Sequence, residues 1–306
     1  MRYVKYIIDQ VRKQTENDEF TDFTGIQDSE FIQYINDAQH NLQAMIVQQH
    51  PRVFIKEKVI NAVNDQEKYA LPDDCYLGNK VHNVEYSSTG LEDDYYVLEE
   101  DTIKRRTPGV SGSPVKYIRM AGELLLTPQP QSSSATIRLN YVQRIREIDL
   151  RRALVSAPAT SSSSTTWTIS LDNGSLSTDT ESLQEHDYVC VVDKEGKTIA
   201  ANIPVNQISA TTLTLDPVSE SVSVLAGHYI VGGKDASTHG DFDRSVERYI
   251  ISYCAFKILK RDSSVDATEA QMELQNIATE IIKSYAYITD DIQLIPQLNS
   301  WDDWSV

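Results

Sequence analysis

One amphipathic segment, residues 28–49, most constrains how this chain can fold. Its apolar side chains recur at steps of three and four residues, at Phe31, Ile35, Ala38, Leu42 and Met45, with Ile32 and Ile46 beside them. This spacing predicts a helix with one apolar face. Its other face should keep Asp37, Gln39, Gln43 and Gln48 in water. Asp28 suits the N-cap, and Pro51 disfavours helical geometry at His50, so we expect the helix to end there.

Helical spacing also occurs at both ends of the chain. Residues 1–14 predict a short amphipathic helix built on Val4, Ile7, Ile8 and Val11. After residue 241 the same period predicts two helices. Their apolar positions are Val246, Ile250, Tyr253 and Cys254 in the first, and Leu274, Ile277, Ala278, Ile281, Ile282 and Tyr285 in the second.

The pattern between residues 54 and 142 is typical of strands separated by Gly, Pro and Ser turns. Residues 54–63 and 67–71 predict two strands around a turn at Asn64-Asp65. Ala121-Gly122 should form the tip of a hairpin. The remaining strands are expected at residues 80–86, 95–98, 115–120, 123–127 and 135–142. This region is therefore predicted to be an antiparallel strand meander.

The composition changes near residue 150. Residues 156–166, SAPATSSSSTT, are of low complexity and predict a flexible linker. Short strands are then expected at residues 167–171, 187–193, 198–205, 211–216 and 228–233. We interpret this region as a small all-β module inserted into a larger fold. The flanking helices can pack together only if the two ends of the module lie close together.

The predicted fold class is α+β. Residues 1–150 would form a body of helices and a strand meander, and residues 151–240 the inserted β-rich module with its Ser/Thr-rich linker. Residues 241–290 would complete the body with a helix pair. Residues 291–306 would form a C-terminal docking tail.

The chain is strongly acidic. It has 28 Lys and Arg against 45 Asp and Glu, a formal net charge of −17. An acidic surface repels nucleic acid and anionic membranes, which disfavours a tight DNA binder but suits a surface past which DNA slides. Three widely spaced cysteines, Cys75, Cys190 and Cys254, predict buried thiols from a reducing compartment. No run approaches the ~20 apolar residues that span a membrane, so we expect a soluble protein without a signal peptide.

The residues predict neither an enzyme, a cofactor nor a metal site. The six histidines are scattered. Residues 227–235, GHYIVGGKD, fail as a phosphate loop because the glycine spacing is one residue too long and Asp235 replaces Ser or Thr. We interpret them as a strand that ends in a glycine turn, and GVSGS at 109–113 as a turn. Adjacent acids, such as Asp73-Asp74, are expected to be exposed.

Two basic clusters and an apolar tail are the candidate interaction residues. The clusters are Lys104 with Arg105 and Arg106, and a second set of Arg144, Arg146, Arg151 and Arg152. They pair with acids of their own surroundings or grip an acidic neighbouring subunit. Direct phosphate binding comes last, because the chain as a whole is acidic. The tail has no period of its own, so its apolar residues should dock on their own domain or on another protein. These residues are Ile292, Leu294, Ile295, Leu298, Trp301 and Trp304.

The order of several segments resembles the head-to-tail adaptor, or connector, proteins of tailed bacteriophages. The segments are SEFIQYINDAQHNLQ at 29–43, YALPDD at 69–74, GSPVKYIRMAGELLLTPQP at 112–130 and IRLNYVQR at 137–144, followed by the C-terminal helix pair. The resemblance covers roughly residues 1–150 and 241–290. The β insert departs from the minimal family pattern.

The resemblance implies a structural virion protein, assembled in the host cytoplasm. It implies a ring of about twelve subunits beneath the portal. Such a ring would extend the DNA channel and offer a docking platform to the tail tube or nozzle. Residues 292–304 would clasp the portal, and the stripe from Phe31 to Met45 would pack against Leu274–Tyr285. Because acidic copies repel one another, we hypothesise ion pairs between subunits from Arg105, Arg106, Arg144, Arg146, Arg151 and Arg152.

Two alternatives stay open at this point. The first is a tail or baseplate component of low oligomeric order, whose β insert contacts a neighbouring tail protein or a host glycan. The second is a hydrolase that uses the acid pairs, or His186 and His228 in the insert. The motif and ligand spacings expected of such an enzyme are absent from the sequence.

Overall fold

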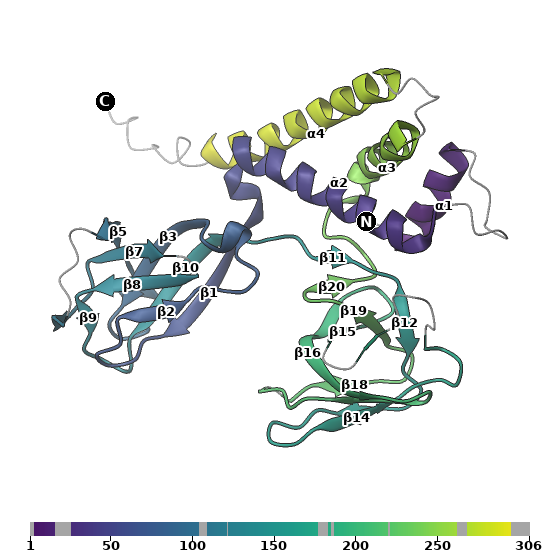
Figure 1. Cartoon of the computed structure of the whole chain (residues 1–306). Coiled ribbons are helices and arrows are strands. Elements are labelled where there is room, and N and C mark those ends of the chain that lie inside the picture. The colour runs from purple at the N-terminus through teal and green to yellow at the C-terminus, as the bar shows by residue number, and fades with distance from the viewer. Residues whose placement is uncertain are drawn as a thin grey trace, which may run out of the picture. The chain divides into compact units, whose positions relative to one another are not determined.

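The computed structural model describes residues 3–15, 26–103, 109–120, 122–176, 183–184, 187–219, 221–261 and 268–294, the last stretch without the side chains of residues 286–294. Over this range the fold is mixed α+β, as expected, with four α-helices and mostly antiparallel strands (Figure 1). The chain divides into two compact units. The first comprises residues 1–44 and 145–284, and the second comprises residues 45–144 and 285–306.

The helices confirm the predicted periodicity. They are α1 (Val4–Gln14), α2 (Asp28–Gln49), α3 (Glu247–Arg261) and α4 (Thr268–Leu294). The apolar positions predicted for α1 are all buried, and so are Phe31, Ile35, Ala38 and Leu42 of α2. None of the described helices is both long and apolar enough to cross a membrane.

Polar contacts join α2 to α3 and α3 to α4. Asn41 of α2 donates a hydrogen bond of 2.7 Å to the Tyr253 hydroxyl of α3, and Glu30 of α2 pairs with Arg261 of α3. Arg248 of α3 pairs with Glu273 of α4 at 3.1 Å. These contacts place α3 against both α2 and α4. The expected packing of the α2 stripe on Leu274–Tyr285 stays a prediction.

The prediction that Gln39 and Gln43 lie in water is wrong. Their exposed fractions are 1% and 0%. The Oε1 atom of Gln43 accepts a hydrogen bond of 3.3 Å from the backbone N–H of Ile145. The Gln43 amide therefore satisfies a backbone group that burial takes from water. Gln39 instead donates to the Oδ1 atom of Asn36 on the same helix, at 3.3 Å.

Two four-stranded sheets form the second unit, with a shared buried core that includes Tyr86, Leu124, Leu126, Ile137 and Tyr141. One sheet has the order β1-β10-β3-β4 and the other β2-β8-β7-β5. Their strands are β1 (Ile55–Asn61), β2 (Lys68–Ala70), β3 (Val81–Ser87), β4 (Tyr96–Val97), β5 (Glu99–Glu100), β7 (Lys116–Met120), β8 (Glu123–Thr127) and β10 (Thr136–Val142).

Local pairing was predicted correctly at one turn and wrongly at another. β7 and β8 form the expected hairpin, with Met120 opposite Glu123. Residues 54–63 and 67–71 do not pair with each other, because β1 pairs with β10 and β2 pairs with β8 in the other sheet. The chain crosses between sheets at Asp65, whose N–H donates to Pro130. In GVSGS, Gly109 lies in a turn as expected, but Ser111–Gly112 form a short strand, β6, which is parallel to β9 (Gln129–Pro130).

The β module of the first unit is a closed six-stranded barrel. Its order is β12-β19-β15-β16-β17-β14. β14 returns to β12 through the bridge between Val155 and Leu171 and the hydrogen bond from Asp172 N to Leu154 O, 2.9 Å. The strands are β12 (Arg151–Leu154), β14 (Trp167–Ser170), β15 (Tyr188–Val192), β16 (Thr198–Ile208), β17 (Thr212–Leu215) and β19 (Tyr229–Gly232). Closure joins the edge strands β12 and β14 to each other, which protects these edges from pairing with a foreign strand.

Apart from Trp167, the barrel core consists of aliphatic side chains that are almost wholly excluded from solvent, among them Ile169, Val191, Ile203, Leu213 and Ile230. The segment 156–166, expected to be a flexible linker, contains β13 (Ala159–Thr160), which pairs with β18 (Ser223–Val224). Ser162 also folds this segment back, because its hydroxyl oxygen accepts the N–H of Thr165 at 3.1 Å. Serine-rich composition therefore indicates turns here rather than a free linker.

Candidate functional site at the base of the β module

The two ends of the β module lie side by side, as the packing of the flanking helices requires. The incoming strand β11 (Glu147–Ile148) pairs in parallel with the outgoing strand β20 (Ala236–Ser237). Arg146 and Asp241 lie just outside these strands, and the Arg146 Nη2 atom is 2.6 Å from Asp241 Oδ1. The backbone N–H of Arg146 donates to the other carboxylate oxygen at 2.7 Å. This pair therefore fastens the entry of the module to its exit.

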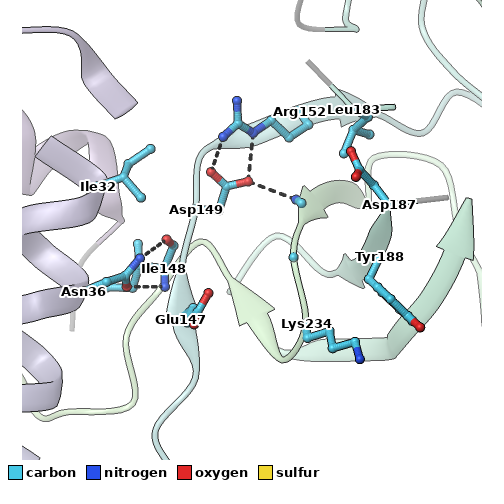
Figure 2. A pocket seen from close by; sticks show the side chains of 12 residues that line it. Ile32, Asn36, Glu147, Ile148, Asp149, Arg152, Leu183, Asp187, Tyr188 and Lys234 are labelled. Carbon is cyan, nitrogen blue, oxygen red and sulfur yellow. Dashed lines mark hydrogen bonds and ion pairs between the residues drawn. The ribbon is translucent and has the colours of Figure 1, made fainter. Parts of the chain in front are cut away.

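A second arginine is held inside the base of the module. Figure 2 shows Arg152 of β12 donating two hydrogen bonds to Asp149, from Nε at 2.8 Å and from Nη2 at 2.6 Å. Asp149 also accepts the N–H of Gly232 at 2.9 Å. Arg152 and Asp149 are exposed by only 9% and 7%. A buried bidentate pair of this kind is costly to break, because one uncompensated charge would remain.

Helix α2 holds the incoming strand through Asn36. The Asn36 side chain donates to the carbonyl of Ile148 at 2.9 Å and accepts the N–H of the same residue at 2.8 Å (Figure 2). One side chain thus supplies both hydrogen bonds that a neighbouring strand would otherwise give. Ile148 itself is buried, so its backbone groups need these partners.

Arg151 completes the base of the module through aromatic rings. Its guanidinium lies 3.7 Å from the centroid of Tyr229 and 4.4 Å from that of Tyr3, which precedes α1. Arginine commonly stacks on aromatic faces in this way. Burial raises the pKa of Tyr3, while Arg151 opposes that rise. The N-terminal segment is tied to the same place, because Val4 N donates to Thr238 O at 3.1 Å.

An open groove of about 510 Å³ adjoins these contacts. Its charged lining residues include Glu147, Asp187 and Lys234, and the Lys234 Nζ atom lies 4.1 Å from the ring centroid of Tyr188. The charges are mixed in sign and the lining brings no nucleophile next to a base. Among the described residues, no group of three His, Cys, Asp or Glu side chains is placed to hold a metal ion.

The predicted arginines lie in different places. Arg146, Arg151 and Arg152 are all engaged within their own chain, so for these three the intramolecular interpretation fits the contacts. Arg144 lies in the second unit, where its N–H donates to the carbonyl of Asp74 at 2.7 Å. Arg105 and Arg106 lie outside the described residues.

The predicted docking tail begins later than expected. Helix α4 runs to Leu294, so Ile292 and Leu294 belong to its last turn. The expectation that the tail begins at residue 291 is therefore wrong, because residues 291–294 continue α4. Ile295, Leu298, Trp301 and Trp304 lie outside the described residues.

Several smaller predictions are confirmed. The three cysteines are free and buried, and burial strongly raises the pKa of Cys254. Within residues 227–235, Tyr229–Gly232 form the strand β19, which lies between Gly227 and Gly233, two glycines with positive φ. One prediction does not hold. Asp74, which belongs to an adjacent acid pair, is partly buried rather than exposed. Burial would raise its pKa, but hydrogen bonds from Lys56 and Tyr141 lower it below the usual value.

Sequence reasoning missed Asn36, Asp149 and Asp241 as partners of this site. Asp149 stands three residues before Arg152, and this close spacing is the one local signal that could have been used. Asn36 and Asp241 lie 112 and 95 residues from their partners along the chain. No local pattern reports contacts at such separations.

Comparison with known proteins gives the context for this architecture. A family model described as SU10 adaptor protein matches residues 4–177, which is more than half of the chain. The chain belongs to this family. A search of the curated proteins finds no match. The SU10 adaptor match spans α1, α2, both sheets of the second unit and the strands of the module through β14, and it ends before α3 and α4.

Membership of the SU10 adaptor family makes this a structural adaptor-type protein of a bacteriophage and a component of the virion. The family is one of structural adaptors rather than of known enzymes. The described contacts agree with a structural role. Arg146 and Arg152 are paired with carboxylates of the same chain, and Arg151 stacks on an aromatic ring.

Proposed function

We propose that this SU10 adaptor protein is a head-to-tail connector. About twelve copies would form a ring beneath the portal, extend the DNA channel and present a platform to the tail tube or nozzle during assembly and genome ejection. The family match over residues 4–177 is the observation that carries this proposal. A connector needs subunits whose parts stay attached when the tail is loaded and when DNA passes.

The net charge of −17 supports the DNA-conduit part of the proposal. DNA is an anion, so an acidic channel wall repels it and allows it to pass without specific binding. The fastened module supports the platform part. The pairs Arg146–Asp241 and Arg152–Asp149 hold the closed barrel at two points of its base. A partner that contacts the barrel would therefore transmit force to the helices through ion pairs rather than through a loose linker.

The first experiment measures the native mass of the purified protein by light scattering, with and without a portal ring. The full chain is compared with a chain truncated after Leu294, the last residue of α4. We expect a ring-plus-portal complex from the full chain and its loss on truncation. A full-length variant with Trp301→Ala and Trp304→Ala separates the tryptophans from chain length. A low-order oligomer indifferent to the portal would favour the tail or baseplate alternative.

The arginine hypothesis is tested separately. With Arg146, Arg151 and Arg152 occupied within the chain, we propose that Arg105 and Arg106 carry ion pairs between subunits. Reversing Arg105 and Arg106 to Glu should prevent ring formation. Arg248→Glu is a matched control, because this arginine pairs with exposed Glu273 on the surface of α3 and α4. Rings that persist unchanged after the double reversal would contradict the hypothesis.

A further inference from the structure

Leu77 is the most exposed large hydrophobic residue of the described chain. Its exposed fraction is 75%, and it lies in the loop between β2 and β3 of the second unit. A single exposed leucine is ordinary on a protein surface. The unit that carries Leu77 is unusual, however, because nine of the thirteen exposed large hydrophobic residues in the described chain belong to residues 45–144. The apolar surface is thus concentrated on the unit that carries Leu77.

The backbone at Leu77 is strained as well. Its φ is 53° and ψ is 16°, and Gly78 follows with a φ of 69°. Asn79 N donates to Tyr76 O at 3.4 Å, so residues 76–79 form a turn whose two central residues both have positive φ. This is the type I′ pattern, which favours Asn, Asp or Gly at the position that Leu77 holds. A branched apolar side chain here has two local costs, the positive φ and the exposure of three quarters of its surface to water.

The loop is nevertheless held firmly. Cys75 N donates to Pro72 O and Gly78 N to Cys75 O, both at 2.9 Å. Cys75 also forms a bridge with Gln143, which continues from β10. Strained residues persist where surrounding hydrogen bonds and packing hold their conformation, and they concentrate at functional sites. Leu77 is therefore presented in one conformation, which lowers the ordering cost of a contact.

Charges around the loop indicate the kind of partner. The exposed Lys80 lies in the loop, Arg119 donates to the carbonyl of Asn79 at 3.4 Å, and Lys56 pairs with Asp74 at 2.8 Å. These three cations stand beside three acids, Asp73, Asp74 and Glu100, so their charges balance, whereas the whole chain has a net charge of −17. The loop is thus less acidic than the protein that carries it. Two acidic copies of the chain therefore repel one another less at this loop than elsewhere on their surfaces.

We propose that Leu77 is an anchor by which one copy of this protein docks on a second copy. The inference rests on the proposed ring, and it identifies the loop 72–80 as one side of the contact between subunits. An apolar side chain seated at the centre of a contact, with charges at its rim, is the usual arrangement of an interface anchor.

The test uses Leu77→Asn, which suits the turn better and removes the apolar side chain. The full chain and the variant are compared by light scattering over a concentration series, with thermal unfolding as a second measurement. We expect Leu77→Asn to unfold at the same or a higher temperature, and to need at least a tenfold higher concentration to assemble. If Leu77 had only a structural role, Leu77→Asn would not weaken assembly while the unfolding temperature stayed the same or rose.

Two variants serve as controls. Leu91→Asn removes another leucine that is 67% exposed but has an ordinary φ of −83°, and it should assemble as the wild type does. Leu77→Met keeps an apolar side chain and should retain assembly. Wild-type assembly that Leu77→Asn leaves unchanged would overturn the anchor alone. A wild type that stays monomeric with and without a portal ring would overturn the proposed function together with the anchor. Self-assembly that persists while portal binding is lost would overturn the second copy as the occupant.

Discussion

Gly196 lies directly against the imidazole of His239, so that a Cβ on Gly196 would stand 2.6 Å from Cγ of the ring. Gly196 also has a φ of 84°. Both residues belong to the first unit, where His239 follows β20 and forms an isolated bridge with Tyr3. The turn before β16 is therefore packed against the segment that leaves the β module.

Replacing Gly196 by alanine should destabilise the first unit by about 3 kcal/mol, because the side chain adds overlap to left-handed strain. Gly174→Ala is the matched control, since its φ is 75° but no atom lies within 4 Å of the added Cβ. We expect it to cost only about 1 kcal/mol. Urea denaturation of both variants measures the difference. Equal losses would contradict the overlap with His239.

The stability of the protein should fall as the pH drops below about 6.5. Burial lowers the pKa of His239, and Arg151 and Arg146 add to that effect, while Asp193 opposes it. The unfolded chain then binds a proton that the folded chain does not, so the free energy of unfolding decreases as protons become available. Thermal unfolding between pH 7.5 and 5 should show this slope, and His239→Gln should flatten it. An unchanged slope would exclude His239 as its source.

Acidic groups act in a lower pH range. The pKa values of Asp94 and Asp243 lie below their usual value because each accepts hydrogen bonds, Asp94 from Ser88 and Thr89 and Asp243 from Ser245. Their contribution to stability is present above the ordinary aspartate pKa of about 4 and is lost as the pH falls through the lowered values. The histidine slope can therefore be measured without interference from these carboxylates.

Arg152→Met should destabilise the first unit by about 3–5 kcal/mol, because it leaves the buried Asp149 carboxylate without its cation. The double variant Arg152→Met with Asp149→Asn removes both charges and keeps an acceptor for Gly232 N–H. We expect it to be more stable than the single variant. Arg248→Met is the control, and its exposed pair with Glu273 should cost less than about 1 kcal/mol. Chemical denaturation distinguishes these outcomes.

Asn36→Ala should expose the backbone amide of Ile148 to hydrogen exchange. The variant removes the side chain that bonds both the N–H and the carbonyl of Ile148, and an unsatisfied buried group costs about 1–3 kcal/mol. Asn64→Ala, in an exposed turn, should leave that amide protected. Exchange rates of the Ile148 amide, measured by NMR or mass spectrometry, test this. Equal protection in both variants would show that α2 does not hold the incoming strand.

Local patterns predicted most elements but few of their partners. The apolar spacing of α1 and α2 placed their buried faces correctly, because a helix repeats every 3.6 residues whatever it packs on. The β7–β8 hairpin followed from a turn that joins adjacent strands. The hairpin predicted for residues 54–71 does not form, because the residue pattern of a strand does not specify which other strand it pairs with. The burial of Gln39 and Gln43 was missed for a related reason, since segments far along the chain decide which face of a helix is covered.

The amino-acid sequence by itself determined the order of helices and strands, the acidic charge, the buried free thiols and the resemblance to phage adaptors. These properties depend on residue type and on neighbours along the chain. The tertiary structure alone decided that the module closes into a barrel, that Arg146 and Arg152 are satisfied within the chain, and that Leu77 is presented on a strained turn. Each of these depends on hydrogen bonds and contacts between residues far apart in sequence, and their energies exist only when the folded backbone brings the groups together.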